Sequence, residues 1–451
     1  MANQNIPHFG RQFSNLCSRH FLFLILFLIV PLFFISVVPA SAEDAMFRAK
    51  PEHTGVYDNG GIEPGNTELW RFATGDLVVS SPTVANGVVY AGSEDKNLYA
   101  IDAVTGKEKW RFTAGDRVTP SPAVANGIVY VGSEDKNLYA IDAVTGNEKW
   151  RFATGGWVYS SAAVANGIVY VGSVNNSLYA IDAMTGKEKW RFTTGDYVDS
   201  SPAVANGIVY VGSKDKNLYA IDALTGNEKW RFATGNWVYS SPAVANGIVY
   251  VGSGDKNMYA IDVVTGKERW RFTAGDRVIS SPAVANGIIY FGSRDKNLYA
   301  IDALTGKEKW RFVAGNSEGS DPAVANGIVY IGSEDKNLYA IDAMTGKEKW
   351  RFATGGWVYS SPTVADGIVY VGNEDKNLYA VGANAVSPIT VPTTISSTPI
   401  PSQITEAGSP TPQATSATTA PVQQPTQHAP LQYALFGAIV VAAGIVILKR
   451  F

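Results

Sequence analysis

Trp110-Arg111-Phe112 is one copy of a tripeptide that occurs eight times in this chain, each copy 40 residues after the one before. The first copy begins at Trp70 and the last at Trp350. A fixed period of roughly 20 to 50 residues is typical of solenoids, propellers and other repeat arrays. We therefore expect features shared by all copies to serve the architecture. A specific activity should lie where the copies differ.

Each copy contains four short segments with strand character. In the second copy, residues 118–125 lead into Asn126-Gly127, a pair that favours a two-residue hairpin turn. Residues 128–132 are a β-branched apolar run of the kind found in buried strands, and residues 137–141 form the third segment. Residues 148–152 alternate charged and aromatic side chains, as a half-exposed strand does. Four antiparallel strands in one period predict a propeller blade.

Proline and charged residues indicate how the strands are ordered within a blade. Pro122 and its counterparts lie in the first predicted strand of seven of the copies. Proline cannot donate to a sheet ladder, so this strand should be the innermost edge, beside the axis. Lys149 and Arg151 place charges on the fourth strand, which discourages pairing with other chains and suits the outer edge.

The ends of the array predict the number of blades. Residues 68–72 supply a fourth strand with no blade before it, and the last copy stops at residue 382 after its third strand. Pairing these two pieces closes the ring. The sequence therefore predicts an all-β fold, an eight-bladed propeller of four-stranded antiparallel blades. Its ring is closed by strand 68–72 pairing with the last blade.

The segments outside the repeats predict export and anchoring. Residues 1–42 have the cations, apolar run and Ala40-Ser41-Ala42 site of a signal peptide, and an uncleaved anchor is the alternative. A lead-in segment at 43–67 precedes the propeller at 68–382. Residues 383–430 form a Pro/Thr/Ser-rich stalk, 431–448 a transmembrane helix and 449–451 a cytoplasmic tail. We expect an extracytoplasmic propeller in a prokaryotic cell envelope, with an anchor of the archaeal type.

Composition excludes several functional classes. The net charge is -3, and no repeat carries the surplus of Lys and Arg that nucleic-acid binding requires. Cys17 is the only cysteine and would leave with the signal peptide. His53 and His428, the histidines of the mature chain, lie outside the repeats. A Cys/His zinc site, a cysteine nucleophile and a Ser-His-Asp triad within the array are excluded.

The repeat unit resembles that of the pyrroloquinoline-quinone-type (PQQ-like) propellers. The resemblance rests on Tyr-Val-Gly-Ser, then Leu-Tyr-Ala-Ile-Asp-Ala-Val-Thr-Gly-Lys, then Trp-Arg-Phe, and covers residues 46–382. Residues 46–55 are similar to the lead-in common in that family. WD repeats share the period but require Gly-His and Trp-Asp pairs, which are absent here. The resemblance implies eight blades.

The family includes quinoprotein dehydrogenases and proteins without a cofactor that serve as scaffolds. The resemblance implies that the enzymes hold a quinone and a calcium on the axis, beneath a ring of adjacent cysteines. This chain has no cysteine pair in its repeats and lacks long insertions. We therefore expect a non-enzymatic binding or scaffold propeller with no catalytic residue, cofactor or metal. The alternatives are a PQQ-dependent dehydrogenase and a purely structural envelope protein.

Variation between copies indicates a binding face. It is concentrated in the connection between blades and in the turn between the second and third strands, both at the same end of a blade. The seventh copy departs most, at residues 316–321. We expect the partner-binding residues to be Trp157, Trp237, Trp357, Tyr159, Tyr197, Tyr239, Tyr359, Arg117 and Arg277.

The expected ligand is a protein, a glycan or cell-wall material, bound by aromatic side chains and by Arg117 and Arg277, which should face each other across the channel. The alternative for Trp157, Trp237 and Trp357 is that they fill the channel mouth. The acidic turns such as 94–97 are expected to be solvated, with calcium loops as the alternative. We expect a monomer that contacts the membrane through its C-terminal anchor and binds no nucleic acid.

Overall fold

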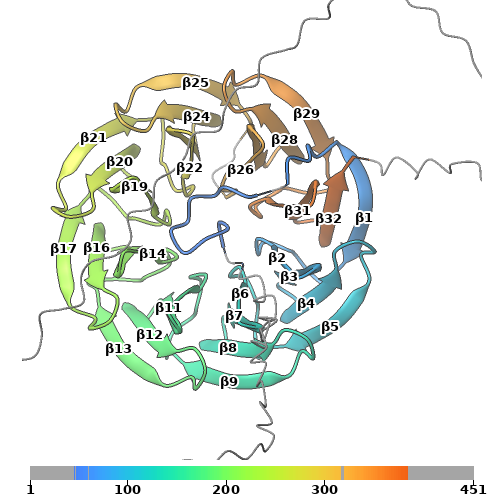
Figure 1. The fold of residues 1–451 in the computed structure, drawn as a ribbon, viewed down its shortest axis with the longest axis horizontal. Helices are drawn as coiled ribbons and strands as arrows, with labels where there is room; N and C mark the ends of the chain where they lie inside the picture. The colour runs from blue at the N-terminus through green and yellow to red at the C-terminus, as the bar shows by residue number, and fades with distance from the viewer. Residues whose placement is uncertain (1–44, 46, 59, 316–318, 384–451) are drawn as a thin grey trace, which may run out of the picture. The chain divides into compact units, whose positions relative to one another are not determined.

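The computed structural model describes residues 45, 47–58, 60–315 and 319–383. Within these ranges the chain forms eight four-stranded sheets and no helix. Every strand pair within the sheets is antiparallel, and the sheets are arranged as blades around a ring (Figure 1). The predicted all-β, eight-bladed propeller is therefore confirmed.

Each blade has an innermost strand followed by a second strand one hairpin turn later. The innermost strands are β2 (Thr83–Ala85), β6 (Ala123–Ala125), β10 (Ala163–Ala165), β14 (Ala203–Ala205), β18 (Ala243–Ala245), β22 (Ala283–Ala285), β26 (Ala323–Ala325) and β30 (Thr363–Ala365). The second strands are β3 (Val88–Gly92), β7 (Ile128–Gly132), β11 (Ile168–Ser173), β15 (Ile208–Gly212), β19 (Ile248–Gly252), β23 (Ile288–Gly292), β27 (Ile328–Gly332) and β31 (Ile368–Gly372).

The third and fourth strands complete each blade toward its outside. The third strands are β4 (Asn97–Asp102), β8 (Asn137–Asp142), β12 (Ser177–Asp182), β16 (Asn217–Asp222), β20 (Asn257–Asp262), β24 (Asn297–Asp302), β28 (Asn337–Asp342) and β32 (Asn377–Gly382). The outer strands are β5 (Glu108–Thr113), β9 (Glu148–Ala153), β13 (Glu188–Thr193), β17 (Glu228–Ala233), β21 (Glu268–Thr273), β25 (Glu308–Val313), β29 (Glu348–Ala353) and, for blade 8, β1 (Thr67–Ala73).

The ring closes as the sequence predicts. The sheet of blade 8 has the order β1-β32-β31-β30, so its outer strand comes from the start of the propeller and its other strands from the end. Trp70 is paired with Ala380 and Phe72 with Leu378. A register shift lies between Glu68 and Trp70. The chain therefore ties its first and last strands together in one sheet.

The innermost strands are shorter than the sequence predicts. The pattern predicts a strand over residues 118–125, whereas β6 contains three residues and Pro122 precedes it. The backbone N–H of Ser121 is directed to the next blade, where it donates to Oγ of Ser161 at 2.9 Å. Because Pro122 has no N–H and Ser121 bonds elsewhere, the ladder cannot extend toward residue 118. The innermost position of this strand is confirmed.

Neighbouring blades are joined by the tryptophans of the Trp-Arg-Phe series. Nε1 of Trp150 in blade 2 donates to the carbonyl oxygen of Ala183 in blade 3 at 3.1 Å, and its ring lies 5.8 Å from that of Tyr130. Six other blades repeat this bond, and Trp350 donates instead to Pro64 of the lead-in segment. These tryptophans therefore pack between neighbouring blades, as expected of a feature that all copies share.

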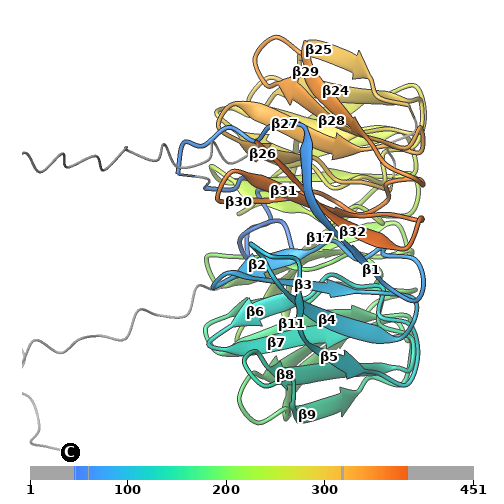
Figure 2. The ribbon, with the colours of Figure 1, turned by 90° about the vertical axis from the view of Figure 1, so that its right-hand side faces the viewer.

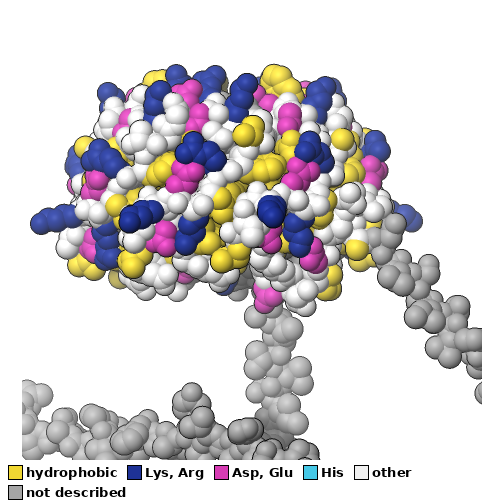
Figure 3. Space-filling view, turned by 90° about the horizontal axis from the view of Figure 1, so that it is seen from above, with side chains coloured by type: hydrophobic (Ala, Val, Ile, Leu, Met, Phe, Trp, Pro, Cys, Tyr) yellow, Lys and Arg dark blue, Asp and Glu magenta, His cyan; other side chains and the backbone are white. Residues whose placement is uncertain are grey.

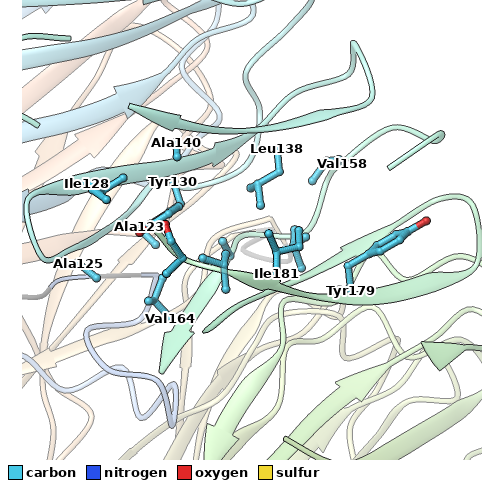
Figure 4. Packing of buried hydrophobic residues seen from close by; sticks show 14 residues of the cluster. Ala123, Ala125, Ile128, Tyr130, Leu138, Ala140, Val158, Val164, Tyr179 and Ile181 are labelled. Atoms are coloured by element: carbon cyan, nitrogen blue, oxygen red, sulfur yellow. Dashed lines mark hydrogen bonds between the residues drawn. The ribbon is translucent and has the colours of Figure 1, made fainter. Parts of the chain in front are cut away.

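The hydrophobic core lies between blades rather than within one. Figure 4 shows one cluster, in which Tyr130, Leu138 and Ala140 of blade 2 pack against Val164 and Ile181 of blade 3. All five side chains are buried. Because every blade buries both of its faces against neighbours, closing the ring leaves no terminal blade with an uncovered apolar face.

Charged side chains cover the outer strands. Arg111 makes two hydrogen bonds to the carboxylate of Glu108, at 2.8 and 2.6 Å, and lies 5.1 Å from the ring centre of Tyr99. The same arginine and glutamate pair recurs in the outer strand of every blade. Basic and acidic side chains consequently lie next to each other on the side of the ring that Figure 3 shows. Such charges oppose pairing with another chain, as predicted for the outer edge.

The acidic turns between second and third strands are hydrogen-bonded clamps. Oδ2 of Asp95 accepts from the hydroxyl of Tyr99 at 2.6 Å and from the N–H of Gly75 at 2.7 Å, and Oδ1 accepts from the N–H of Asn97 at 3.0 Å. Equivalent aspartates occupy six other blades, and Asn175 takes the position in blade 3. Among the described residues no group of three or more His, Cys, Asp or Glu side chains is placed to hold a metal ion. These bonds give the aspartates a structural role.

A closed ring of hydrogen bonds surrounds the channel. At one position in each blade, the backbone N–H donates to the side-chain oxygen of the same position in the next blade. The eight distances are 2.5 to 3.1 Å. We call this set the serine ring. Its members are Ser81, Ser121, Ser161, Ser201, Ser241, Ser281, Asp321 and Ser361, all of them buried.

The lead-in segment closes one end of the channel. Its carbonyl groups accept hydrogen bonds from the innermost strands of successive blades: Pro51 from Val204, Glu52 from Val244, Thr54 from Val284 and Gly55 from Val324, at 2.7 to 2.9 Å. Phe47, Arg48 and His53 of the same segment are buried. Figure 1 shows this dark-blue segment crossing the central opening and then running outward to β1, and Figure 2 shows that it lies at one end of the ring.

The remaining sequence predictions concern residues outside the described part of the chain. The signal peptide at 1–42, the stalk at 383–430 apart from residue 383, the transmembrane helix at 431–448 and the tail at 449–451 all fall there. Within the described ranges, no helix long and apolar enough to cross a membrane is found.

Candidate binding face

The two ends of the ring differ in construction. One end, which we call the turn face, carries the Asn-Gly turns and the Asp-x-x-Thr-Gly turns together with the lead-in segment. The other end, the variable face, carries the connections between blades and the turns between second and third strands. The N–H of Glu134 in such a turn donates to the carbonyl of Arg117 in the connection at 3.0 Å, so the two variable positions of a blade are adjacent. All nine predicted site residues lie on the variable face.

Three tryptophan and tyrosine pairs occupy the connections of blades 3, 5 and 8. The ring centroids of Trp157 and Tyr159 are 5.9 Å apart at an interplanar angle of 73°, an edge-to-face contact. The pairs Trp237 with Tyr239 and Trp357 with Tyr359 have similar geometry, at 5.8 and 5.9 Å. Trp157, Trp237 and Trp357 are 47, 39 and 42% exposed. They are therefore partly accessible from solvent.

The exposed aromatic residues of the described chain gather on this face. They are Trp157, Tyr159, Tyr197, Trp237 and Trp357. A depression of about 350 Å³ lies between blades 3 and 4, lined by Trp157, Tyr197 and Lys136 among others. Aromatic rings with exposed faces supply large contact area at low conformational cost, which is why they are enriched at binding surfaces.

The two predicted arginines are engaged by near neighbours. Nη1 of Arg117 lies 3.5 Å from the carboxylate of Glu94, and the guanidinium carbon of Arg277 lies 6.0 Å from the ring centre of Trp237. They belong to blades 2 and 6, four blades apart as predicted. Each arginine is therefore held beside a residue of an adjacent blade, and together they place cations on opposite sides of the channel mouth.

The turns between second and third strands give the channel mouth a divided charge. In ring order, blades 7, 8, 1 and 2 carry glutamate at this position, whereas blades 4 and 6 carry a cation. The residues are Glu334, Glu374, Glu94 and Glu134 on one side, and Lys214 and Arg294 on the other. Glu334 also accepts a hydrogen bond from the hydroxyl of Tyr359 at 3.1 Å. We call the two parts the acidic half and the basic half of the mouth.

The glutamates are close enough to affect one another. Partial burial raises the pKa of Glu134, the nearby Arg117 lowers it, and Asp116 and Glu94 raise it. Burial, then the charges of Glu334 and Glu94, raise the pKa of Glu374. A positive charge placed over this half would relieve that repulsion. Arg117 also lies in this half, beside Glu94, so four glutamates share one arginine and the acidic half is suited to a further basic group.

The basic half contains a partly buried ion pair that orders two predicted tyrosines. Nζ of Lys214 lies 3.0 Å from Asp199, 4.5 Å from the ring centre of Tyr197 and 5.1 Å from that of Tyr239. Burial raises the pKa of Asp199, and Lys214 opposes that change. This cation-π arrangement holds both rings near the mouth.

The comparisons with known proteins agree with this architecture. A family model described as outer membrane protein assembly factor BamB matches residues 60–159, 153–237, 236–319 and 313–385. These matches together cover most of the chain and all eight blades. The chain belongs to the BamB family. No curated protein is similar enough in sequence to match it.

Solved structures similar to this BamB-family chain show the same fold. BamB from Moraxella catarrhalis is 18% identical with a TM-score of 0.63, over 70% of this chain and 99% of that one. The computationally designed protein Ika8 is 20% identical with a TM-score of 0.63, over 70% and 99%. Quinohemoprotein alcohol dehydrogenase from Comamonas testosteroni is 18% identical with a TM-score of 0.64, over 77% and 82%. The fold is therefore shared by BamB and by quinone-dependent enzymes.

The described residues near the axis do not fit a quinone and calcium site. Asp321 is buried and paired with Arg48 of the lead-in segment, their nearest charged atoms 3.6 Å apart. Asp199 is paired with Lys214. Both carboxylates are therefore committed to cations of this BamB-family chain, and the repeats contain no cysteine. The side chains expected for that cofactor from the resemblance are not assembled.

Some features of the variable face were not predicted. Variation between copies predicts the aromatic residues and both arginines, whereas the divided charge was not predicted. That charge is carried by Glu334, Glu374, Glu94 and Glu134 on one side and by Lys214 and Arg294 on the other. The signal was present, since these residues occupy the same position in successive copies. It emerges only when the copies are placed in ring order, which joins blade 8 to blade 1.

Proposed function

We propose that this chain is a non-enzymatic binding scaffold of the cell envelope that holds a protein partner on its variable face. The observation that carries the proposal is the segregation of exposed aromatic side chains: all those of the described residues lie on that face. The channel is closed from the opposite end by the lead-in segment. The name of the family, an assembly factor, supports a role in binding other proteins.

The charge pattern defines the partner more closely. We propose that the partner presents a basic stretch to Glu334, Glu374, Glu94 and Glu134 and an acidic stretch to Lys214 and Arg294. Trp157, Trp237 and Trp357 would supply the apolar contacts around these charges. A protein segment combines both charge signs with apolar side chains, whereas a neutral glycan offers only ring faces for stacking. The arrangement therefore favours a protein over a glycan.

We also propose a location for the propeller in the cell. The propeller would lie outside the cytoplasm, exported through residues 1–42 and anchored through residues 431–448. The stalk would hold it away from the membrane, with the variable face free to receive its partner.

An array experiment tests the proposal. Purified full-length protein is applied to an array of peptides with separated, mixed or absent charge and to an array of glycans. We expect peptides with one basic and one acidic block around aromatic or aliphatic residues to be retained best, and retention to weaken with salt. Retention of glycans alone, or of no probe, would contradict a protein-binding function.

A further inference from the structure

Blade 3 lacks two aspartates that other blades place on the variable face. In the connection it has Gly156 at the position of Asp116, and in the turn between its second and third strands it has Asn175 at the position of Asp135. Blades 1, 2, 4 and 6 carry an aspartate at both positions, and blades 5, 7 and 8 carry one in the turn. Blade 3 is therefore the one blade with no carboxylate at either position.

The missing aspartate of the connection leaves a lysine without an ion pair. Nζ of Lys96 lies 3.5 Å from Asp116 of the next connection, and Nζ of Lys376 lies 3.2 Å from Asp76 in the same way. Lys136 takes this position in blade 2, but the connection that follows it has no aspartate. Lys136 is exposed and forms no ion pair with any described residue. Its ammonium group is therefore available to an anion from another molecule.

The missing aspartate of the turn frees a backbone N–H. In six other blades a glycine donates its N–H to the aspartate of the turn at 2.6 to 2.8 Å. In blade 3, Nδ2 of Asn175 donates instead to the carbonyl oxygen of Thr154 and to the hydroxyl of Tyr179. The carbonyl of Thr154 and the N–H of Gly155 belong to one trans peptide and point in opposite directions, so this N–H is directed away from Asn175. Gly155 has a φ of 87°, is exposed, and its N–H has no partner among the described residues.

Both donors lie in the depression of about 350 Å³ on this face, which is lined by Lys136, Gly155, Gly156, Trp157, Val174, Asn175 and Tyr197. Its volume is within the range of ligand pockets, about 300 to 1,000 Å³. Of the described residues that line it, Lys136 alone has a charged side chain. Trp157 and Tyr197 are 47 and 42% exposed. The depression thus offers a cation, a free N–H and two aromatic rings, which suit a carboxylate beside an apolar side chain.

The depression adjoins the basic half of the mouth. The ring centre of Tyr197, in its wall, lies 4.5 Å from Nζ of Lys214. Lys214 is already paired with Asp199 at 3.0 Å, and the carboxylate of Asp196 accepts from the N–H of Tyr197 at 2.8 Å. An acidic segment that reaches the basic half therefore finds an unpaired cation next to it, at Lys136.

We propose that this depression binds an acidic residue of the partner protein together with the apolar residue next to it. The carboxylate accepts from the N–H of Gly155 and pairs with Lys136, and the apolar side chain lies between Trp157 and Tyr197. This inference rests on the function proposed above, because it names the residues that receive the acidic stretch of the partner. Blade 3, which lacks both aspartates, anchors that stretch.

Disulfide capture on the full-length protein tests the inference. Cys17 is first replaced (Cys17→Ser), which leaves a chain without thiols. Val174→Cys then places one thiol in the wall of the depression, and Glu374→Cys, at the same position of blade 8, is the matched control. This position carries Glu, Lys, Gly or Arg in the other copies, so the turn tolerates the change. The probes are the synthetic peptides Gly-Glu-Phe-Gly-Cys and Gly-Gln-Phe-Gly-Cys, each with its cysteine activated as a mixed disulfide.

We expect the glutamate peptide to couple to Val174→Cys about fivefold faster than the glutamine peptide does, as one partly exposed charge pair allows. It should couple no faster than the glutamine peptide to Glu374→Cys. Adding Lys136→Gln to Val174→Cys should remove the preference. Lys336→Gln, which changes the corresponding exposed lysine of blade 7, should leave it intact.

A second variant tests the role of the free N–H. Asn175→Asp, Asn176→Lys and Ser177→Asn together give blade 3 the turn residues of blade 4, so the turn should form. The new carboxylate should take the N–H of Gly155 and remove the preference at Val174→Cys. Equal rates of the two peptides at Val174→Cys, or a preference that survives Lys136→Gln, would overturn the inference. If peptides were still retained on the array, the function proposed for the variable face would stand without this site.

Discussion

Arg48 of the lead-in segment lies 3.6 Å from Asp321, the one member of the serine ring that is not a serine. Asp321 still takes part in the ring: it accepts from the N–H of Ser281 and donates its own N–H to Ser361. Both charged groups are buried, and burial lowers the pKa of Arg48 and raises that of Asp321. A single substitution in the repeats thus ties the non-repetitive lead-in segment to the ring.

Breaking this pair should destabilise the protein. Asp321→Ser restores the uniform ring but leaves Arg48 buried without its carboxylate, which typically costs about 3–5 kcal/mol. The double variant Arg48→Met with Asp321→Ser should recover most of that loss. Unfolding in urea, monitored by tryptophan fluorescence, measures the free energy of unfolding of the single and the double variant. If Asp321→Ser alone were as stable as the original protein, the pair would have no role in holding the lead-in segment.

Histidine burial predicts a dependence of stability on pH. Burial, helped by the charge of Arg48, lowers the pKa of His53 to about 3, whereas the unfolded value is about 6.5. The folded state therefore resists taking up a proton that the unfolded chain binds, so stability is full above pH 6.5 and declines as the pH falls. The slope should approach about 1.4 kcal/mol per pH unit between these values.

The control for this prediction is His53→Leu, which keeps an apolar contact with Phe47 and removes the titrating group. Its free energy of unfolding should change much less between pH 6.5 and pH 4.5. The aspartates of the Asp-x-x-Thr-Gly turns titrate lower, since hydrogen bonds from Thr105 lower the pKa of Asp102 to about 2. Their stabilisation is lost only below about pH 4. Equal slopes for the two proteins would contradict the assignment to His53.

Close contact between blades predicts that replacing one glycine, Gly172, lowers the stability of the protein. A Cβ on Gly172 in β11 would collide with the carbonyl oxygen and the side chain of Val198 in blade 4. Gly172→Ala should therefore cost about 1–3 kcal/mol by overpacking. Gly207→Ala, in an Asn-Gly turn with open space around it, is the comparison and should cost about 1–2 kcal/mol from its positive φ alone. Thermal unfolding that ranked Gly207→Ala as the worse change would contradict this account of blade packing.

The acidic turns should be insensitive to calcium. The carboxylate of Asp135 is occupied by the hydroxyl of Tyr139 and the backbone N–H groups of Gly115 and Asn137. Removing these bonds with Asp135→Ala should cost about 1.5–3 kcal/mol, because they involve a charged acceptor. Millimolar calcium and a chelator should both leave the Tm unchanged. A rise in Tm with calcium would show that these turns bind the ion.

Most of the fold could be predicted because every copy of the repeat contains the same four strands and turns at a fixed spacing. The Trp-Arg-Phe period sets the blades, and the unmatched strand at Trp70 indicates ring closure. The length of the innermost strand was wrong, because nothing in residues 118–122 alone shows that Ser121 bonds to the next blade. The serine ring could not be predicted for the same reason, because its bonds join residues 40 positions apart, such as Ser121 and Ser161, and form only in the closed ring.

The candidate site could be predicted only in part. Trp157, Trp237 and Trp357 stand out because they interrupt a nearly invariant pattern. The buried contact of Arg48 with Asp321 could not be predicted, since one residue lies outside the repeats and the other was noted only as part of an unusual copy. The packing of Ile62 of the lead-in segment against Gly367 was missed for the same reason. Relations between a repeat and a non-repeating segment carry no periodic signal.

The most direct test of the central claim measures the affinity of the best array-selected peptide for three proteins. These are the original protein, the triple variant Trp157→Ala, Trp237→Ala and Trp357→Ala, and the turn-face control Val144→Ser, Leu224→Ser and Leu304→Ser. The exposed tryptophans should act as binding anchors worth about 2 kcal/mol each, so the triple variant should bind at least 100-fold more weakly at an unchanged Tm. The control should bind like the original. Unchanged affinity in the tryptophan variant, or equal losses in both variants, would contradict the assignment of binding to the variable face.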